Sequence, residues 1–211
     1  MSQPDTKQRI LDAAERLFAT DGFHATSMRM ITGQAAVNLA AINYHFGSKE
    51  ELLAAVIDRR LVPLNAERNR LLEQELESAR RQARPPSVRQ LVRAMVAPTV
   101  ALRGQGEGPE HFITLVGRIL ADPQGIGRDL FLERMGPFIS RLFEAMRQAL
   151  PHLDPGLLFW RLHFSIGALS HVMRCHDRHL RLPMPFDPSL PPEELIETLL
   201  DFIEAGLEAK P

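Results

Sequence analysis

The chain has 211 residues, of which 45% are hydrophobic and 24% charged, and its formal net charge is -1 at pH 7. These values are typical of a folded chain with one or two hydrophobic cores and argue against disorder, while the near-zero charge excludes no class of partner. The N-terminal sequence MSQPDTKQRI has no basic-then-apolar pattern, no charge-free apolar run approaches the roughly 20 residues of a membrane helix, and the lone Cys175 cannot form an internal disulfide, so we expect a cytoplasmic protein with no membrane partner.

Three short helices are predicted at the start of the chain. Over residues 5–20 the apolar residues recur at three- and four-residue spacing, and Asp21-Gly22 then ends the helix. Ser27 is expected to cap a second helix that ends near residue 37, and Asn38 to cap a third over residues 39–46. Two short helices therefore meet at a tight turn.

A fourth helix follows the break at Gly47. The sequence Ser-Lys-Glu-Glu at 48–51 has the form of a capping box, in which the serine and the glutamate satisfy each other's backbone N–H groups. After the apolar residues of this helix, the sequence is rich in arginine and glutamate up to Arg84-Pro85-Pro86. We therefore expect two domains, 1–60 and 61–211.

The second domain is predicted to be helical throughout. Its expected helices run from the cap at Ser87 to 102, from 110 to 121, from 128 to 150 with a kink at Gly136-Pro137, from 154 to about 179 as the longest helix, and from 192 to 209. Strand-like alternation is missing from the sequence, so helix-on-helix packing must bury the apolar residues. The expected fold class is all-α.

The short helix at 39–46 has the composition of an element that enters the major groove of DNA. A helix, a sharp turn and a second short helix, supported by a first helix, is the geometry that places one helix in the groove. Ala40 and Ala41 allow the backbone to approach the duplex, Asn43 is suited to pair with adenine, and Leu39 offers apolar contact. We expect double-stranded DNA as a partner.

Groups suited to phosphate oxygens surround this helix, both as side-chain donors and as helix N-termini. Residues 1–60 carry seven basic and seven acidic side chains, which counts against DNA binding unless the helix N-termini supply positive ends. The predicted DNA-contact set is Thr26, Ser27, Arg29, Asn38, Leu39, Ala40, Asn43, Tyr44, His45 and Lys49.

Two segments of the first domain, ILDAAERLFATDGFHATSM and VNLAAINYHFGSKEELL, carry a family resemblance. With them, residues 1–60 resemble the DNA-binding domain of the TetR family of bacterial transcription regulators. In that family the segment matching 27–46 is the helix-turn-helix, and the positions matching Tyr44 and Lys49 commonly contact phosphates. The chain departs from the family pattern at Met30-Ile31-Thr32-Gly33, which we interpret as variation in packing.

The resemblance implies that the second domain binds a small effector and forms a homodimer. A small, mainly apolar effector is expected in a pocket lined by Phe112, Leu115, Val116, Ile119, Phe131, Met135, Phe138, Phe143 and Phe164, although each of these is also suited to an ordinary core. The expected dimer interface lies on the last two long helices and contains Leu157, Trp160, Leu169, Leu195, Leu199, Phe202 and Ile203, although these faces could be buried within one chain instead.

Finer interpretations and alternatives stay open at this point. LFWRLHFSIGA, at 158–168, resembles a PsrA-type subgroup that responds to long-chain fatty acids or acyl-CoA. His171, Cys175 and His179, with His176 beside them, favour a metal or redox sensor as one alternative, but the ends of this row are about 12 Å apart along a helix, too far for one ion. An all-helical small-molecule carrier is the other alternative. No catalytic or nucleotide-binding motif occurs, so we expect no enzymatic activity and no cofactor.

Overall fold

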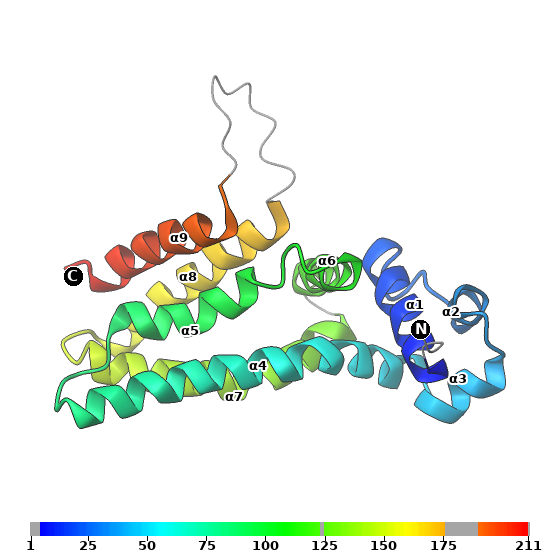
Figure 1. Cartoon of the computed structure of the whole chain (residues 1–211), viewed down its shortest axis with the longest axis horizontal. Coiled ribbons are helices and arrows are strands. Elements are labelled where there is room, and N and C mark those ends of the chain that lie inside the picture. The colour runs from blue at the N-terminus through cyan, green and yellow to red at the C-terminus, as the bar shows by residue number, and fades with distance from the viewer. Residues whose placement is uncertain (1–4, 123–124, 176–189, 211) are drawn as a thin grey trace, which may run out of the picture. The chain divides into compact units, whose positions relative to one another are not determined.

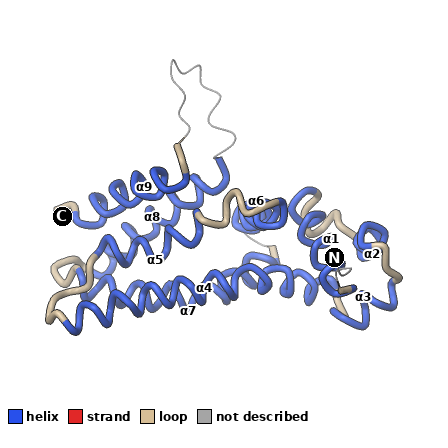
Figure 2. The backbone as a smooth tube through the Cα atoms, in the orientation of Figure 1, coloured by secondary structure: helices blue, strands red, loops and turns tan. Residues whose placement is uncertain are grey.

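The computed structural model describes residues 5–122, 125–175 and 190–210. Every regular element in this part of the chain is an α-helix, which confirms the all-α prediction (Figure 1). The helices are α1 (Thr6–Thr20), α2 (Met28–Ala35), α3 (Leu39–Phe46), α4 (Lys49–Arg81), α5 (Val88–Val100), α6 (Glu107–Ala121), α7 (Ile126–Ala149), α8 (Pro155–Cys175) and α9 (Pro192–Glu208). Figure 2 shows them joined by loops, and none of these described helices is long and apolar enough to cross a membrane.

The helix starts follow from the capping residues in the sequence. Ser27 Oγ accepts a hydrogen bond from Met30 N at 3.2 Å, and Asn38 Oδ1 accepts one from Ala41 N at 2.8 Å. Both caps satisfy a backbone donor that the first helical turn leaves free, which is why polar residues at these two positions fix the starts of α2 and α3.

Helix α4 is longer than the sequence pattern indicates. It starts at the predicted capping box, where Ser48 N donates to Glu51 Oε2 at 3.0 Å and Glu51 N donates to Ser48 Oγ at 3.1 Å. It then runs 33 residues to Arg81, through Pro63. Arginine and glutamate are strong helix formers, so the charged stretch after residue 61, expected to begin a new domain, continues the helix instead. The expectation that the helix from 154 is the longest is wrong for the described residues, in which α8 spans 21.

The chain packs into two compact units, which do not follow the order of the sequence. Unit 1 contains Met1–Pro63 and Arg103–Arg134, and unit 2 contains Leu64–Leu102 and Met135–Pro211. Helices α4 and α7 each contribute to both. Compact packing and function need not divide a chain at the same point, so the functional boundary near residue 60 stays a prediction.

In unit 1, α1 packs against α2, α3 and α6. The apolar stripe predicted for the first helix forms its centre, with Ile10, Ala14 and Phe18 fully buried. Ile31 of α2 and Ile42 of α3 are equally buried, so each short helix is anchored by an apolar side chain in this core. This packing leaves the opposite face of α3 open.

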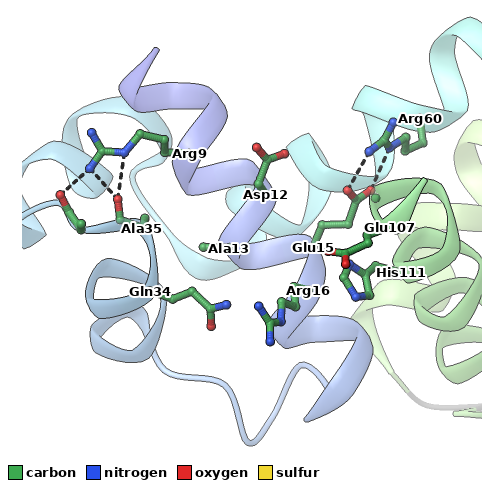
Figure 3. Close-up of a pocket in the computed structure, with 12 residues that line it drawn as sticks. Arg9, Asp12, Ala13, Glu15, Arg16, Gln34, Ala35, Arg60, Glu107 and His111 are labelled. Atoms are coloured by element: carbon green, nitrogen blue, oxygen red, sulfur yellow. Dashed lines mark hydrogen bonds and ion pairs between the residues drawn. The ribbon is translucent and has the colours of Figure 1, made fainter. Parts of the chain in front are cut away.

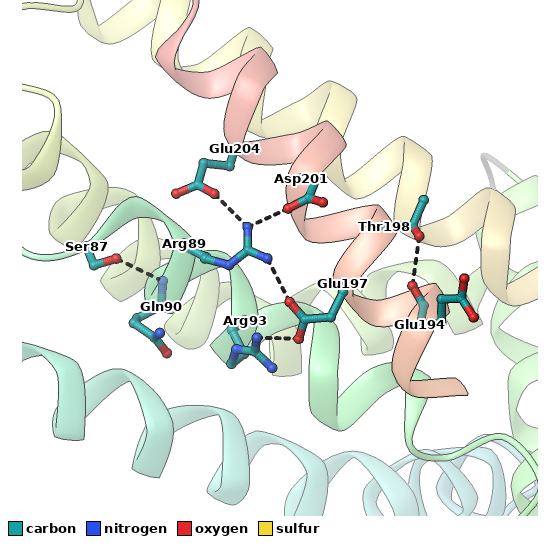
Figure 4. Close-up of polar contacts among 9 residues, drawn as sticks. All are labelled: Ser87, Arg89, Gln90, Arg93, Glu194, Glu197, Thr198, Asp201 and Glu204. Atoms are coloured by element: carbon teal, nitrogen blue, oxygen red, sulfur yellow. Dashed lines mark hydrogen bonds and ion pairs between the residues drawn. The ribbon is translucent and has the colours of Figure 1, made fainter. Parts of the chain in front are cut away.

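In unit 2, α5 packs against α9, and arginines on α5 pair with carboxylates on α9 along the contact (Figure 4). Arg89 contacts Glu197 and Asp201 at 2.7 Å and Glu204 at 2.8 Å, and Arg93 contacts Glu197 at 2.5 Å. The hydrogen bonds that Arg89 donates, above all to Glu204, raise its pKa. The hydrogen bonds that Glu197 accepts from Arg93 and then Arg89 lower the pKa of Glu197. These groups are partly exposed, so the network mainly fixes the register of the two helices.

The connection between α4 and α5 is held by the carboxylate of Glu75. Its Oε1 accepts from Arg84 Nη1 and from Ser87 N, both at 2.7 Å. Burial opposes ionisation of Glu75, but the hydrogen bonds from Arg84 and Ser87 outweigh it and lower the pKa of the carboxyl group. The acidic side chain thus fixes the start of α5.

Candidate functional site

The turn between α2 and α3 has the geometry of a helix-turn-helix. Ala36 lies in the left-handed region, with φ 51° and ψ 49°. Val37 N donates to Thr32 O at 3.1 Å and Ala36 N donates to Gly33 O at 3.4 Å, which together make a Schellman motif. Because both bonds close on the last turn of α2, they fix the direction in which the chain enters α3.

Arg9 of α1 binds the backbone of this turn, a role that sequence reasoning missed. Its Nε and Nη2 donate to Ala35 O at 3.0 and 2.6 Å, and Nη2 also donates to Ala36 O (Figure 3). These carbonyls lie at the C-terminal end of α2, where a positive charge is favourable. No sequence pattern signals such a contact, because both acceptors are backbone atoms.

Helix α3 presents one buried and one exposed face. Ile42 and Phe46, four residues apart, are 0% and 7% exposed and anchor the helix in the core of unit 1. Tyr44 is 86% exposed and Leu39 43%. The residues of the exposed face are Leu39, Ala40, Asn43 and Tyr44. All four belong to the predicted DNA-contact set, and they form one continuous surface.

Other members of the predicted set lie around this face. His45 is half-buried, with its ring 5.2 Å from that of Tyr44. Arg29 is exposed on α2, and its guanidinium has no partner among the described residues. The side-chain oxygens of Ser27 and Asn38 act as helix caps, so these two residues would offer backbone donors at helix N-termini.

Two predicted phosphate contacts are used inside the protein instead. Thr26 is 1% exposed, and its hydroxyl donates to Gly22 O at 2.8 Å and lies 3.2 Å from Leu17 O, so it has no free donor for a phosphate. Lys49 Nζ donates to Phe23 O at 2.9 Å and to Thr26 O at 3.0 Å. Two of the three ammonium donors of Lys49 therefore tie the loop after α1 to the start of α4.

A polar cleft of about 650 Å3 in unit 1 is lined by residues of α1, α2, α4 and α6, and Arg9 and Ala35 of the turn contact are among them. Within it, Glu15 is 1% exposed and accepts from Arg60 Nε and Nη2, both at 3.0 Å (Figure 3). Glu15 also accepts from Arg59 Nη2. A Cβ at Gly108 would collide with the Arg60 guanidinium, so glycine lets α6 approach this ion pair. The Glu15 hydrogen bond raises the pKa of Arg60 although burial opposes it. The cluster connects α1 to α4 in the unit that carries α3.

Both parts of the chain match known protein-family models. A family model described as "Tetracyclin repressor-like, C-terminal domain" matches residues 93–206, and one described as "Bacterial regulatory proteins, tetR family" matches residues 10–56. The chain belongs to the TetR family. The resemblance of the two N-terminal segments is thus confirmed, and the match over residues 93–206 extends the TetR assignment to the C-terminal half.

Curated relatives and solved structures match this chain over different lengths. The HTH-type transcriptional regulator UidR of Escherichia coli (strain K12) is 43% identical over 56 residues, which are 26% of this chain and 28% of that protein. The fatty acid degradation regulator FadR from Bacillus halodurans has a TM-score of 0.70 at 15% identity and full coverage of both chains. AibR, in complex with isovaleryl coenzyme A and operator DNA, has a TM-score of 0.60 at 22% identity and covers 94% of this chain and 97% of its own. At such identities these structures share the fold alone.

The predicted pocket residues of this TetR chain are divided between the two units. Phe112, Leu115, Val116, Ile119 and Phe131 belong to unit 1, and Met135, Phe138, Phe143 and Phe164 to unit 2. In unit 1, Leu115 and Ile119 line a cavity of about 440 Å3 together with residues of α1 and α4. In unit 2, Phe138 is 1% exposed, whereas Phe164 is 66% exposed. The assignment of Phe164 to a pocket is wrong, because its side chain points outward from α8.

The described parts of α8 and α9 expose large apolar side chains. Phe159 and Trp160 are each 54% exposed, Phe164 66% and Phe202 69%. The Trp160 ring lies 5.8 Å from that of Phe159 and 6.0 Å from that of Phe164. We call Phe159, Trp160, Phe164 and Phe202 the aromatic surface. Sequence reasoning placed Trp160 and Phe202 in the dimer interface and Phe164 in the pocket set, and it did not single out Phe159.

Of the remaining predicted interface residues, three are buried within the chain and two are half-buried. Leu169, Leu199 and Ile203 are 6%, 6% and 2% exposed, and Leu157 and Leu195 are half-buried. The helical periodicity of α9 explains the difference, because Leu199 and Ile203 share one face and Phe202 lies on another. Unit 2 of a single chain therefore already buries the first three, which removes them from the predicted interface.

The metal alternative falls largely outside the described residues. His176 and His179 are not among them, and the Cys175 side chain is not described either, while His171 is exposed on α8. In the part of the chain that is described, no group of three or more His, Cys, Asp or Glu side chains is arranged to hold a metal ion.

Proposed function

We propose that this TetR-family protein is a homodimeric transcriptional repressor that binds a palindromic operator through α3 and is released by a small, mainly apolar effector. The observation that carries the proposal is the exposed face of α3, which presents Asn43 and Tyr44 from a helix capped and fixed at both ends. A short, rigid helix with a polar exposed face is what the major groove admits. The protein would act in the cytoplasm.

The roles of the α3 residues follow from their chemistry. Asn43 reads adenine by a bidentate contact, and Leu39 and Ala40 touch thymine methyl groups. Tyr44 and His45 donate to phosphates on either side and set the register without reading sequence. The N-terminus of α2, with Arg29 in its first turn, adds positive potential where the net charge of residues 1–60 supplies none.

Dimerisation is supported by the aromatic surface of α8 and α9. Four large exposed aromatic side chains on neighbouring helices are unusual for a free monomer and typical of an interface. A twofold axis through this surface would pack α8 and α9 against their copies, and two recognition helices would then reach half-sites about 34 Å apart. The dimer test is sedimentation of Phe164→Glu, with Gln148→Glu at an exposed position of α7 in the same unit as control. We expect only Phe164→Glu to give monomers, and equal dimer stability of both variants would refute this assignment.

The effector class is supported by two kinds of likeness. The segment 158–168 resembles fatty-acid-responsive regulators, and two proteins with the same fold are a fatty acid degradation regulator and AibR in complex with isovaleryl coenzyme A. An effector that favours one conformer of the C-terminal half would change the spacing of the two α3 helices, with α4 as the connecting lever. A differential affinity of about 1–3 kcal/mol is enough for such coupling.

The function is tested by a gel shift with DNA from immediately upstream of the protein's own gene, at low and moderate salt, with and without fatty acids or acyl-CoA. Specific binding that an acyl ligand releases supports the whole proposal. Specific binding that no acyl ligand affects keeps the regulator and removes this effector class. Failure to bind this DNA, together with failure to select any duplex from genomic fragments, would refute the regulator and favour a small-molecule carrier.

A further inference from the structure

Arg68 of α4 is buried inside unit 2. It is 5% exposed, although arginine is almost never fully buried unless its charge is paired. Other arginines of this unit follow the rule, since Arg89 and Arg141 both lie at the surface against carboxylates. Arg68 is therefore the residue of unit 2 whose position most needs an explanation.

The partners of Arg68 are all neutral. Nη1 donates to Asn65 Oδ1 at 2.8 Å and to Met135 Sδ at 3.1 Å, and Nη2 donates to Thr99 Oγ1 at 2.7 Å. The guanidinium carbon also lies 5.4 Å from the centre of the Phe138 ring. No carboxylate of the described residues contacts it, so its positive charge is solvated by an amide, a hydroxyl, a thioether and a ring.

Not every N–H group of the Arg68 guanidinium makes a hydrogen bond. Of its five N–H groups, three make the hydrogen bonds above, and the buried Nε has no acceptor in the described part of the chain. The Nε–H and Nη2 lie on the same edge of the guanidinium, the edge that binds both oxygens of a carboxylate. Burial lowers the pKa of Arg68 to about 10, so the group keeps its charge at neutral pH although desolvation opposes it.

The weakest acceptor among the partners of Arg68 is the sulfur of Met135. Met135 and Gly136 are only half-buried, and a thioether is a weak acceptor on a flexible side chain. A Cβ built on Gly136 would meet nothing within 4 Å, so α7 borders open space at the residue that follows Met135. An anionic oxygen that displaces the sulfur would accept from Nη1 close to the ring of Phe138, while the Nε–H stays available on the other edge of the guanidinium. Both Met135 and Phe138 belong to the expected pocket set.

We propose that Arg68 recognises the anionic group of the effector, a carboxylate or a phosphate attached to an apolar body. This proposal rests on the proposed function, because it names the ligand class of the effector site in the C-terminal half. A purely structural role explains the arginine poorly, since an apolar side chain of similar length would fill the same space without a buried charge. The positive charge of Arg68, which has only neutral partners, can instead form an ion pair with an anionic ligand.

The test uses the full chain and matched pairs of ligands. Octanoate, benzoate and octanoyl-CoA are compared with the neutral octanol and benzyl alcohol by thermal unfolding and by calorimetric titration. We expect at least one anion to raise the Tm of the wild-type protein, and its neutral counterpart to leave it unchanged. Carboxylates alone would identify a carboxylate ligand, and octanoyl-CoA alone a phosphate ligand. Equal effects of acids and alcohols, or no effect of any anion, would overturn the proposal.

Variants then connect the anion to this side chain. Arg68→Met should bind the active anion about tenfold more weakly or worse, while its Tm without ligand stays equal to the wild type or rises. Arg141→Met, the same change at an exposed arginine of the same unit, should respond to the anion like the wild type. If Arg68→Met does not fold, Arg68→Lys keeps the charge but loses Nε and should still bind about tenfold more weakly. Unchanged anion binding in the variant that folds would overturn the proposal.

The readouts separate this proposal from the proposed function. Anion binding is measured without DNA, so it succeeds or fails whether or not an operator exists. On an operator, the wild type and Arg68→Met should bind equally without ligand, and the anion should release only the wild type. Anion binding through Arg68 in a protein that binds no DNA would leave this proposal standing and refute the repressor.

Discussion

Replacing Glu15 with alanine should destabilise the protein more than any surface charge change. The substitution removes a 1% exposed carboxylate that accepts from both Arg59 and Arg60. Removing one member of a buried ion pair costs about 3–5 kcal/mol. Because Arg59 and Arg60 are 16% and 25% exposed and Asp12 still contacts Arg59, we expect about 3 kcal/mol. This should lower the Tm by about 6–12 °C in a chain of this size.

Two further variants separate charge from packing. Glu15→Gln keeps one carbonyl acceptor and should cost about 1.5 kcal/mol. Asp12→Asn removes a 64% exposed carboxylate from the same Arg59 and should cost about 0.5 kcal/mol or less. Urea unfolding followed by circular dichroism gives the three values, and the single Trp160 reports by fluorescence whether unit 2 unfolds in the same transition. If Glu15→Ala costs no more than Asp12→Asn, the buried cluster does not hold α1 to α4 as described.

The remaining predictions concern backbone strain, pH and a displaced lysine. Ala36→Gly relieves a left-handed alanine and should raise stability by about 0.5–1 kcal/mol, while Ala55→Gly within α4 should lower it by about 1 kcal/mol, both read from urea midpoints. The lowered pKa of Glu75 means that its ionised form stabilises the fold above pH 4.5, the usual carboxyl value, and that this contribution is lost as the pH falls through the lowered pKa. The difference in unfolding free energy between the wild type and Glu75→Gln should therefore shrink below pH 4.5. A difference that stays constant with pH would contradict this. Lys49→Met should lower the free energy of unfolding by about 1–2 kcal/mol, read from the urea midpoint, because two carbonyls lose their donor. A lysine that only faces DNA would leave the midpoint unchanged.

The parts of the fold that follow from local chemistry were predictable. The caps at Ser27 and Asn38, the capping box before α4 and the apolar spacing of α1 each depend on a few neighbouring residues. The exposed face of α3 follows as well, because Ile42 and Phe46 fix the buried side of an eight-residue helix. Such features need only the period of the helix and the chemistry of its ends.

The features that sequence reasoning missed depend on distant contacts. Phe164 and Phe138 are the same residue type, yet one lies on the surface and the other in the core, and only packing decides between them. Thr26 has the donor that a phosphate needs, but a backbone carbonyl already accepts from it. Arg68 would be assigned to the surface by residue type alone. Local patterns identify helices, while burial and partners identify sites.

The central claim, that α3 reads DNA sequence, is tested most directly by fluorescence anisotropy on a duplex selected from random DNA. Wild-type protein is compared with Asn43→Ala and with Asn69→Ala, a control on α4 in unit 2, at several salt concentrations. The account predicts a loss of about tenfold or more for Asn43→Ala on the selected duplex, with unchanged non-specific binding and an unchanged salt slope. Selection of no duplex, or equal affinity of Asn43→Ala and Asn69→Ala for the selected one, would contradict it.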